Sequence, residues 1–295
     1  MKLSCFTDEI SQDPAYAFTG RDLAYALDVM REYGVQGAEL RGVWDKNISD
    51  LTDAEAKDAR KLLDAKGVAC SCIGSPLLKC ELYPPGGGEA EAAQIREQQL
   101  AKLRRCIRMA EIFGTDVIRV FSFWKRGEMI AEVEDAIVAA LLEMAEIAAK
   151  SGKIIALEGE GSCYVATSEE IAHILSRVNL PNMMAAWDPS NGFCGGEELP
   201  YPEGYELLKG RIAHIHIKDC LRTLNGGIRL MVIGEGEIDY KGLFAALISD
   251  GYKGYVSLET HYTPLGGTQE QGTRVFLTGL KYLLDNARVT LQGGE

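Results

Sequence analysis

The feature of this sequence that most constrains its fold is a regular alternation between short apolar runs and longer segments with helical spacing. Such alternation is typical of βα units, in which helices connect parallel strands. The chain of 295 residues is long enough for one large α/β barrel. We therefore predict an α/β fold, a (β/α)₈ TIM barrel, with these eight strands: Leu3–Phe6, Ala38–Arg41, Val68–Ile73, Val117–Phe121, Ile154–Glu158, Met184–Asp188, Ala213–Lys218 and Tyr255–Glu259.

Helix signals fit this arrangement. Thr52 with Glu55 and Thr167 with Glu170 have the spacing of capping boxes, where a loop gives way to a helix. No linker or low-complexity segment interrupts the pattern, so we expect a single domain over residues 1–295. Two apolar stripes at helical spacing are expected to face the barrel: Leu100, Leu103, Ile107 and Ala110; and Val133, Ile137, Leu141, Met144 and Ala148.

The lengths of the connections indicate where a site would lie. Helix-to-strand connections are short, whereas three strand-to-helix connections are long: Gly74–Ala90, Asn191–Gly204 and Asp219–Gly236. In a barrel these all lie on the C-terminal face, where active sites of this fold are built. The stretch Pro84–Gly88 has the composition of either a mobile lid edge or a solvated surface loop.

Charge and composition exclude several classes of partner. A net charge of −12 repels phosphate backbones and anionic lipids, so we expect no nucleic-acid and no membrane partner. The first ten residues contain Asp8 and Glu9 instead of a basic, apolar leader, which predicts a cytoplasmic protein. The eight cysteines form no CxxC pairs, so we expect reduced thiols.

Polar residues that bind metals follow four strands in the second half of the chain. Glu158, Asp188, His216 and Glu259 would stand at one level of the barrel and converge on one point. A buried carboxylate is costly without a cation or donor beside it, so one divalent ion explains all four. The alternative is a set of unrelated rim residues in ion pairs. His214, His216 and Lys218 share the inward face of their strand, and His216 lies nearest the mouth among the histidines.

The sequence resembles the sugar isomerase and epimerase barrels related to xylose isomerase and endonuclease IV. Within this family the sequence is similar to the keto-sugar 3-epimerase branch. That resemblance implies that the metal is held by Glu158, Asp188, His216 and Glu259, and that both glutamates also move protons. The resemblance spans most of the chain through these motifs: Thr7–Ile10, Glu39–Arg41, Glu158, Trp187–Asn191, His214–Asp219, Gly234–Asp239 and Ser257–Glu259.

Two departures from the family pattern bear on the reaction. No histidine precedes His173, which removes the early ligands of the endonuclease cluster and the ring-opening histidine of xylose isomerase. The sequence therefore fits a site with one metal better than a three-metal cluster, and a substrate in its open or keto form better than a closed sugar ring. Asn191 stands where the epimerases often have a histidine, and its amide is a candidate for a substrate hydrogen bond.

Further substrate contacts are predicted, each with a structural alternative. Lys218 is predicted to contact the substrate, and the alternative is a salt bridge at the rim of the barrel. Arg222 is also predicted to contact the substrate, and the alternative is a solvated loop side chain. Glu235 could hydrogen-bond the substrate or stabilise the turn in which it lies. Trp124 could stack on a sugar ring or pack against apolar residues at the rim of the barrel. His261 follows the last strand as a loop residue. Glu39 and Arg119 occupy otherwise apolar strands, and we expect them to form a buried pair.

These observations predict a metal-dependent isomerase or epimerase of a keto sugar, which removes a proton next to a metal-bound carbonyl, with Glu158 and Glu259 as catalytic residues. Three oxygen donors and one imidazole suit Mn²⁺, Mg²⁺ or Co²⁺, with Zn²⁺ as a further option. Two alternatives stay open: a lyase acting on a keto-inositol or 3-keto sugar, and a non-catalytic sugar-binding barrel. The expected partner is a small sugar, with a homo-oligomer possible.

Overall fold

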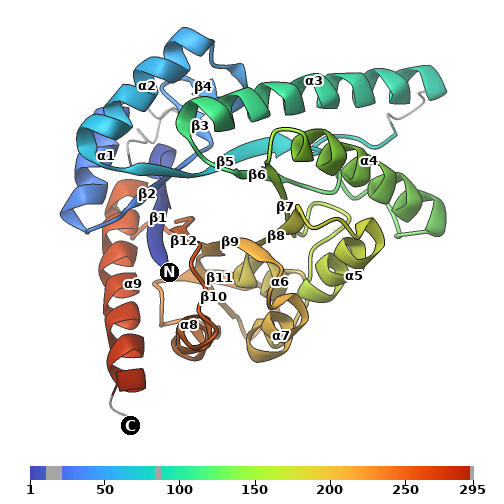
Figure 1. The fold of residues 1–295 in the computed structure, drawn as a ribbon. Helices are drawn as coiled ribbons and strands as arrows, with labels where there is room; N and C mark the ends of the chain where they lie inside the picture. The colour runs from blue at the N-terminus through green and yellow to red at the C-terminus, as the bar shows by residue number, and fades with distance from the viewer. Residues whose placement is uncertain (11–21, 84–87, 293–295) are drawn as a thin grey trace.

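Eight parallel strands close into a barrel in the computed structural model, which describes residues 1–10, 22–83 and 88–292 (Figure 1). The order around the barrel is β1-β12-β9-β8-β7-β6-β5-β2. This confirms the predicted TIM barrel. The strands are β1 (Lys2–Phe6), β2 (Gly37–Leu40), β5 (Ala69–Leu77), β6 (Val117–Val120), β7 (Ile154–Glu158), β8 (Met183–Trp187), β9 (Ile212–Ile217) and β12 (Tyr255–Leu258).

The third barrel strand is longer than the sequence pattern predicted. The predicted connection begins at Gly74, but β5 continues to Leu77 across an irregularity in its pairing with β6. Arg119 of β6 explains this extension, because its guanidinium donates to the carbonyl oxygens of Gly74 (3.1 Å) and Ser75 (3.3 Å). The other predicted strands match the observed bounds to within one residue at each end.

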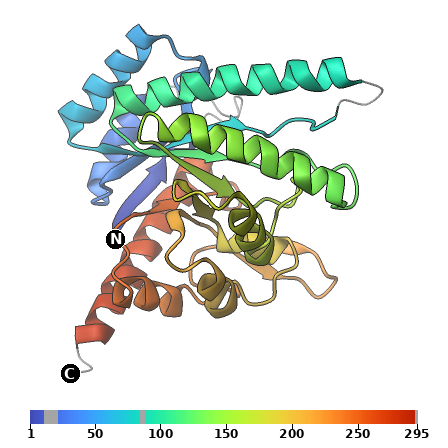
Figure 2. The ribbon, with the colours of Figure 1, turned by 45° about the vertical axis from the view of Figure 1, so that its right-hand side comes forward.

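Helices surround the barrel, and Figure 2 shows α3 and α4 side by side along one flank. Both predicted capping boxes are present, at the starts of α2 and α5. Gly67 and Gly114 end α2 and α3 in the left-handed conformation that glycine adopts without strain. The helices are α1 (Leu23–Glu32), α2 (Asp53–Lys66), α3 (Glu89–Phe113), α4 (Ala131–Ala149), α5 (Ser168–Val178), α6 (Pro189–Cys194), α7 (Tyr205–Leu208), α8 (Tyr240–Ser249) and α9 (Gln269–Gln292), with single turns η1 (Thr7–Glu9), η2 (Ile48–Asp50) and η3 (Pro200–Gly204).

The core lies between this ring of helices and the barrel. Both predicted apolar stripes, on α3 and α4, are buried there. Trp187 points outward from β8 into the same layer, and its indole N–H donates to Ser168 Oγ at 2.9 Å. Within the described ranges, no helix is both long and apolar enough to span a membrane.

Two small hairpins, not anticipated from the sequence, shape the loops. β3 (Gly42–Val43) pairs with β4 (Lys46–Asn47), and β10 (Asp219–Arg222) pairs with β11 (Ile228–Met231). Asp219 anchors the second hairpin, because its carboxylate accepts from the backbone N–H of Gly234 (2.8 Å) and Gly236 (3.0 Å). A Cβ at Gly236 would lie 2.0 Å from Asp219 Oδ1, so only glycine fits there. Residues 84–87 of the expected lid lie outside the described residues.

Candidate metal centre

Four buried side chains from four adjacent strands converge at the C-terminal end of the barrel. Glu158 ends β7, Asp188 follows β8, His216 lies in β9 and Glu259 follows β12. Each offers one ligand atom, and these atoms all lie within 4.8 Å of one another. The exposed fractions of the four residues are between 0 and 4%. Four donors at this separation form a candidate site for a single cation.

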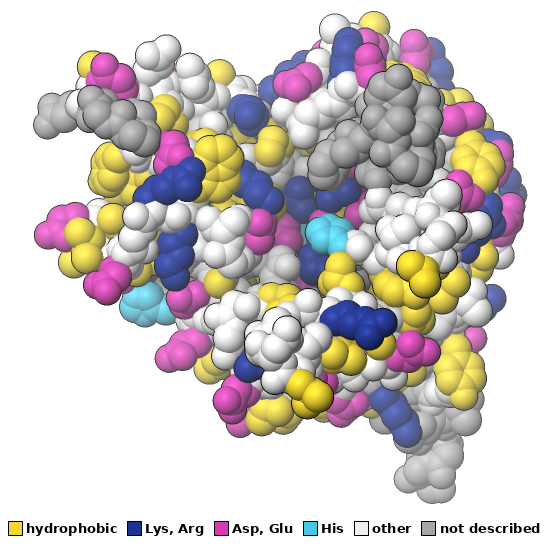
Figure 3. Space-filling view, turned by 180° about the vertical axis from the view of Figure 1, so that it is seen from behind, with side chains coloured by type: hydrophobic (Ala, Val, Ile, Leu, Met, Phe, Trp, Pro, Cys, Tyr) yellow, Lys and Arg dark blue, Asp and Glu magenta, His cyan; other side chains and the backbone are white. Residues whose placement is uncertain are grey.

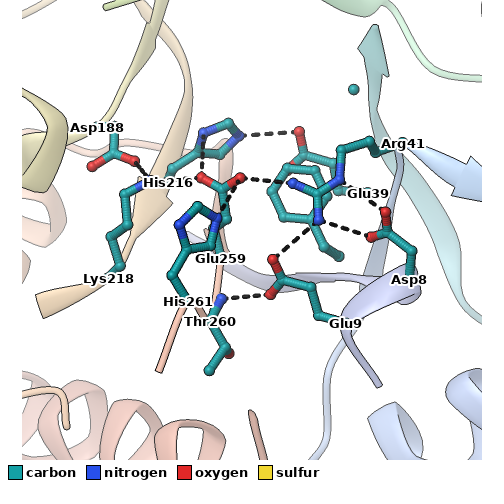
Figure 4. A network of polar contacts seen from close by, with 12 residues as sticks. Asp8, Glu9, Glu39, Arg41, Asp188, His216, Lys218, Glu259, Thr260 and His261 are labelled. Carbon is teal, nitrogen blue, oxygen red and sulfur yellow. Dashed lines mark hydrogen bonds and ion pairs between the residues drawn. The ribbon is translucent and has the colours of Figure 1, made fainter. Parts of the chain in front are cut away.

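The imidazole of His216 is oriented by a carboxylate behind it. Its Nε2 lies 3.0 Å from Glu39 Oε1 (Figure 4). The other oxygen of Glu39 lies 2.7 Å from His214 Nε2. A hydrogen bond from Nε2–H to Glu39 leaves Nδ1 as the lone-pair donor, 3.3 Å from Glu158 Oε1. Glu39 therefore fixes both the ring and the tautomer that a metal ligand requires.

One buried ligand atom in this cluster lacks a hydrogen bond. His216 Nδ1 is enclosed and has no hydrogen-bond partner among the described residues, whereas Asp188 Oδ2 is held by an ion pair with Lys218 Nζ at 2.8 Å. Buried polar atoms are rarely left in this state, because the cost of desolvation is then not recovered. A cation bound beside His216 Nδ1 would accept its lone pair. Three carboxylates and one imidazole match the donor preference of Mn²⁺, Mg²⁺, Co²⁺ or Zn²⁺, so these residues fit a divalent ion.

Lys218 lies among the same carboxylates. Its Nζ is 2.8 Å from both Asp188 Oδ2 and Glu259 Oε2. Burial opposes the charge of Lys218, but its acidic neighbours outweigh burial and raise the pKa of its ammonium well above the usual range. The ammonium thus remains protonated and competes with any bound cation for two of its ligands.

Two arginines hold the glutamates from the opposite half of the barrel. Arg119 of β6 donates to Glu158 Oε2 at 3.0 Å. Arg41, after β2, donates to Glu259 Oε1 at 2.9 Å and also binds Asp8 and Glu9. The expectation that Glu39 and Arg119 pair directly is wrong, because Glu39 reaches across to the histidines of β9 while Arg119 reaches Glu158.

The pKa of Glu9 departs from that of an ordinary carboxyl. Burial raises it to about 7, and Arg41 opposes the rise only in part. Glu9 belongs to a chain of contacts that leads through Arg41 to Glu259 (Figure 4). This chain ties the start of the barrel to its last strand.

A cavity of about 640 Å³ opens above the four candidate ligands. Figure 3 shows a hollow on this face in which basic, acidic and histidine side chains lie together. Three of the predicted substrate-binding residues line the cavity: Asn191, Lys218 and His261. Asn191 Nδ2 donates to Glu158 Oε1 at 3.1 Å. These three residues are therefore placed to contact a molecule in the cavity.

The other three predicted substrate-binding residues do not line this cavity. Arg222 lies on the β10–β11 hairpin, stacks on Phe193 at 4.5 Å and donates to backbone carbonyls. Glu235 is exposed in the turn that follows. Trp124 packs at the rim, with the guanidinium of Arg126 5.4 Å from its ring centroid. The structure therefore does not bring these three side chains into the cavity, and their predicted contacts with a substrate stay predictions.

Several residues of the site were not assigned a role from the sequence. Asp8, Arg41, Lys46 and Lys79 line the cavity, and Glu39 supports His216. Asp8 lies two residues after β1 and Arg41 directly follows β2, much as Asp188 and Glu259 follow β8 and β12. The signal that identified the ligands, a charged residue at a strand end, was therefore present in the first half as well.

Two relatives illustrate how this chain compares with characterised families. It is 24% identical over 157 residues to an inosose dehydratase of Geobacillus thermodenitrificans, covering 48% of this chain and 52% of that protein. It is 23% identical to a probable endonuclease 4 of Methanoculleus marisnigri, covering 66% of this chain and 72% of that protein. The chain thus spans only about half the length of the dehydratase that it matches.

Solved structures share the fold at low identity. An L-ribulose 3-epimerase aligns with a TM-score of 0.75 at 17% identity, covering 99% of this chain and 97% of that one. The IOLI protein with a bound zinc atom aligns with a TM-score of 0.76 at 19% identity, covering 97% and 99%. A xylose isomerase-like TIM barrel protein from Mycobacterium smegmatis in complex with magnesium aligns with a TM-score of 0.71 at 17% identity, covering 97% of both chains.

The barrel topology, the cluster at its C-terminal end and these similarities agree with a family assignment. A family model described as xylose isomerase-like TIM barrel matches residues 27–284 of this chain. The proteins to which this chain is similar include an L-ribulose 3-epimerase and an inosose dehydratase. This protein belongs to the xylose isomerase-like TIM barrel family.

Proposed function

We propose that this protein is a metal-dependent isomerase or epimerase of a keto sugar or sugar derivative. The observation that carries the proposal is the placement of two carboxylates in one cavity. Glu158 and Glu259 come from strands on either side of β8 and β9, and both line the cavity. They therefore approach a bound molecule from different directions.

The two glutamates are suited to carry protons. In each carboxylate one oxygen is fixed by an arginine, Arg119 for Glu158 and Arg41 for Glu259. A carboxylate held in this way keeps its orientation while the substrate changes. If one glutamate removes a proton from a carbon and the other returns a proton to the opposite face, the carbon is inverted. If one glutamate performs both transfers on one face, an aldose and a ketose interconvert.

The remaining residues have supporting roles in this proposal. When bound by Glu158, Asp188, His216 and Glu259, a divalent ion supplies Lewis acidity that makes a carbon next to a carbonyl group more acidic. Asn191 and His261 are placed to hold hydroxyl groups of the substrate. Lys218 presents a protonated amine to the same cavity and can stabilise a developing negative charge.

Dehydration of a keto-inositol is the second candidate, favoured by the similarity to an inosose dehydratase. The first step is the same removal of a proton next to the carbonyl group. The reactions diverge afterwards, because in dehydration the hydroxyl group on the next carbon takes up a proton and leaves as water. Lys218 and His261 are the cavity residues that could donate that proton.

Isotope exchange distinguishes these reactions. The protein loaded with Mn²⁺, Mg²⁺ or Co²⁺ is incubated in D₂O with a panel of ketoses and inososes, and the recovered compounds are analysed by NMR and mass spectrometry. Deuterium in a stereoisomer of the starting compound supports epimerisation or isomerisation, whereas an unsaturated product that has lost water supports dehydration. Chelated protein is the control. If no compound takes up deuterium and none loses water, both candidates are contradicted.

A further inference from the structure

The charge of the cavity above the metal centre bears on the kind of substrate it accepts. Five Lys or Arg side chains and His261 line the cavity, and five acidic side chains line it with them. Asp188, Glu9 and Glu39 lie directly behind this lining, in contact with its members or with His216. A divalent ion and His261 together add at most three positive charges, which these three additional carboxylates match. The cavity therefore has no surplus of positive charge.

The three inner cations are each committed to carboxylates. Arg41 binds Glu259 at 2.9 Å and Asp8 at 2.8 Å. Arg119 binds Glu158 at 3.0 Å, and Lys218 lies 2.8 Å from Glu259. These side chains are between 5 and 14% exposed, so water screens their charges weakly. Taking a cation away from its partner here would leave a buried carboxylate uncompensated.

The two outer cations have carboxylate partners as well. Lys46 Nζ lies 2.6 Å from Glu55 Oε1 on one wall of the cavity. On the other wall Lys79 pairs with Glu160, and its ammonium lies 4.6 Å from the centroid of the Phe121 ring. Glu160 is itself held in place, since Ser162 Oγ donates to its other oxygen at 2.5 Å. Among the described residues, each Lys or Arg of the lining thus faces a carboxylate.

This pattern favours hydroxyl groups over anions. A phosphate or carboxylate that approached Lys79 would also approach Glu160, so attraction and repulsion would largely cancel. An ion pair in a cavity wall instead presents a donor and an acceptor side by side. A hydroxyl group both donates and accepts, so it can bind both members of such a pair without separating them.

We propose that the cavity selects uncharged polyhydroxy ketones over phosphorylated or carboxylated ones, and that Glu160 is a specificity residue because it neutralises Lys79. This inference rests on the proposed function and specifies its substrate class. Glu160 comes two residues after the candidate ligand Glu158 and lies at the outer part of the same cavity.

Matched ligands test the inference by binding alone. Affinities of the Mg²⁺-loaded protein for D-ribulose, D-fructose and their terminal phosphate esters are measured by ligand-observed NMR titration. We expect each uncharged ketose to bind at least about tenfold more tightly than its ester, a difference within reach of a like charge in a poorly screened cavity. An ester that binds as tightly as its ketose overturns the inference while leaving the proposed function in place. If neither ketose nor ester binds, both fail.

A substitution tests the role of Glu160. Glu160→Gln keeps the side-chain length but frees the charge of Lys79, so affinity for the phosphate esters should rise by roughly fivefold, as for removal of a partly exposed like charge. Glu198→Gln makes the same change in net charge at an exposed residue outside the cavity and should have no such effect. If both variants change ester affinity equally, or if neither does, Glu160 is not the specificity residue.

Discussion

The two halves of the barrel contribute differently to the candidate metal centre. The last four strands, β7, β8, β9 and β12, carry the four candidate ligands. The first four strands carry no candidate ligand of this set among the described residues, yet they supply the groups that hold the ligands. Glu39 orients His216, Arg41 binds Glu259, and Arg119 binds Glu158. The second half of the barrel thus provides the candidate metal ligands, and the first half provides the side chains that orient them.

This division has a physical reason. Metal ligands must be close to one another, and adjacent strand ends achieve this without long side chains. Their supporting partners must approach from behind or from across the barrel, where the opposite strands lie. Because buried carboxylates are costly unless paired, each half would be less stable without the other.

The largest expected effect comes from removing a ligand in the second half. His216→Ala deletes the only imidazole in the cluster and should reduce metal affinity by more than about a hundredfold. His173→Ala is the matched control, because that histidine is exposed and pairs with Glu134 outside the cavity. Metal content after dialysis against a defined free-metal buffer measures both. If the two variants retained the same amount of metal, His216 would not be a ligand and the assignment of the ligands to the second half of the barrel would be wrong.

Replacing a glutamate by glutamine tests its catalytic role separately from its role as a ligand. Glu158→Gln and Glu259→Gln each keep an oxygen donor but remove the basic charge, so turnover should fall by roughly a hundredfold. Metal affinity should fall less than turnover. Steady-state kinetics and metal titration of the same preparations provide the two numbers. Near wild-type turnover in both metal-loaded variants would mean that another group carries the proton.

The first half is tested by Glu39→Gln. The amide can still accept from one histidine but lacks the charge that strengthens His216 as a ligand, so metal affinity should fall by about tenfold. Glu55→Gln offers a control on the same half of the barrel, at a residue that pairs with Lys46 instead of a ligand. An unchanged affinity in Glu39→Gln would show that the first half does not tune the centre.

The smallest expected effect is an increase in metal affinity, whereas the substitutions above lower it. Lys218 competes with a bound cation for Asp188 and Glu259, so Lys218→Met should increase metal affinity by a few-fold, up to about tenfold. Catalysis by the variant should nevertheless decline, because a protonated amine is lost from the cavity. Calorimetric titration with Mn²⁺ measures the change in affinity. A weaker affinity would mean that Lys218 supports the ligands instead of competing for them.

Much of the fold was predictable because hydrophobic periodicity repeats in each βα unit. The strand ends also identified Glu158, Asp188, His216 and Glu259 as a group, since carboxylates and histidine are unusual at the ends of apolar strands. Depth along β9 favoured His216 over His214 as the ligand, and in the structure His214 Nε2 instead contacts Glu39.

Contacts across the barrel were not predictable in the same way. Residue parity shows that Glu39 and Arg119 both face inward, but not which side chain each one meets. The structure pairs them with His216 and Glu158 because those groups complement their charges at the distances that the closed barrel sets. The β10–β11 hairpin illustrates the same limit, since its fold directs Arg222 toward Phe193 and away from the cavity.

The most direct test of the central claim is to locate the metal. Crystals of protein loaded with Mn²⁺ or Co²⁺ are measured at the absorption edge of the ion, and an anomalous difference map shows where it binds. The account predicts one strong peak per chain, within coordination distance of Glu158, Asp188, His216 and Glu259. A map with no peak at these four side chains would contradict it.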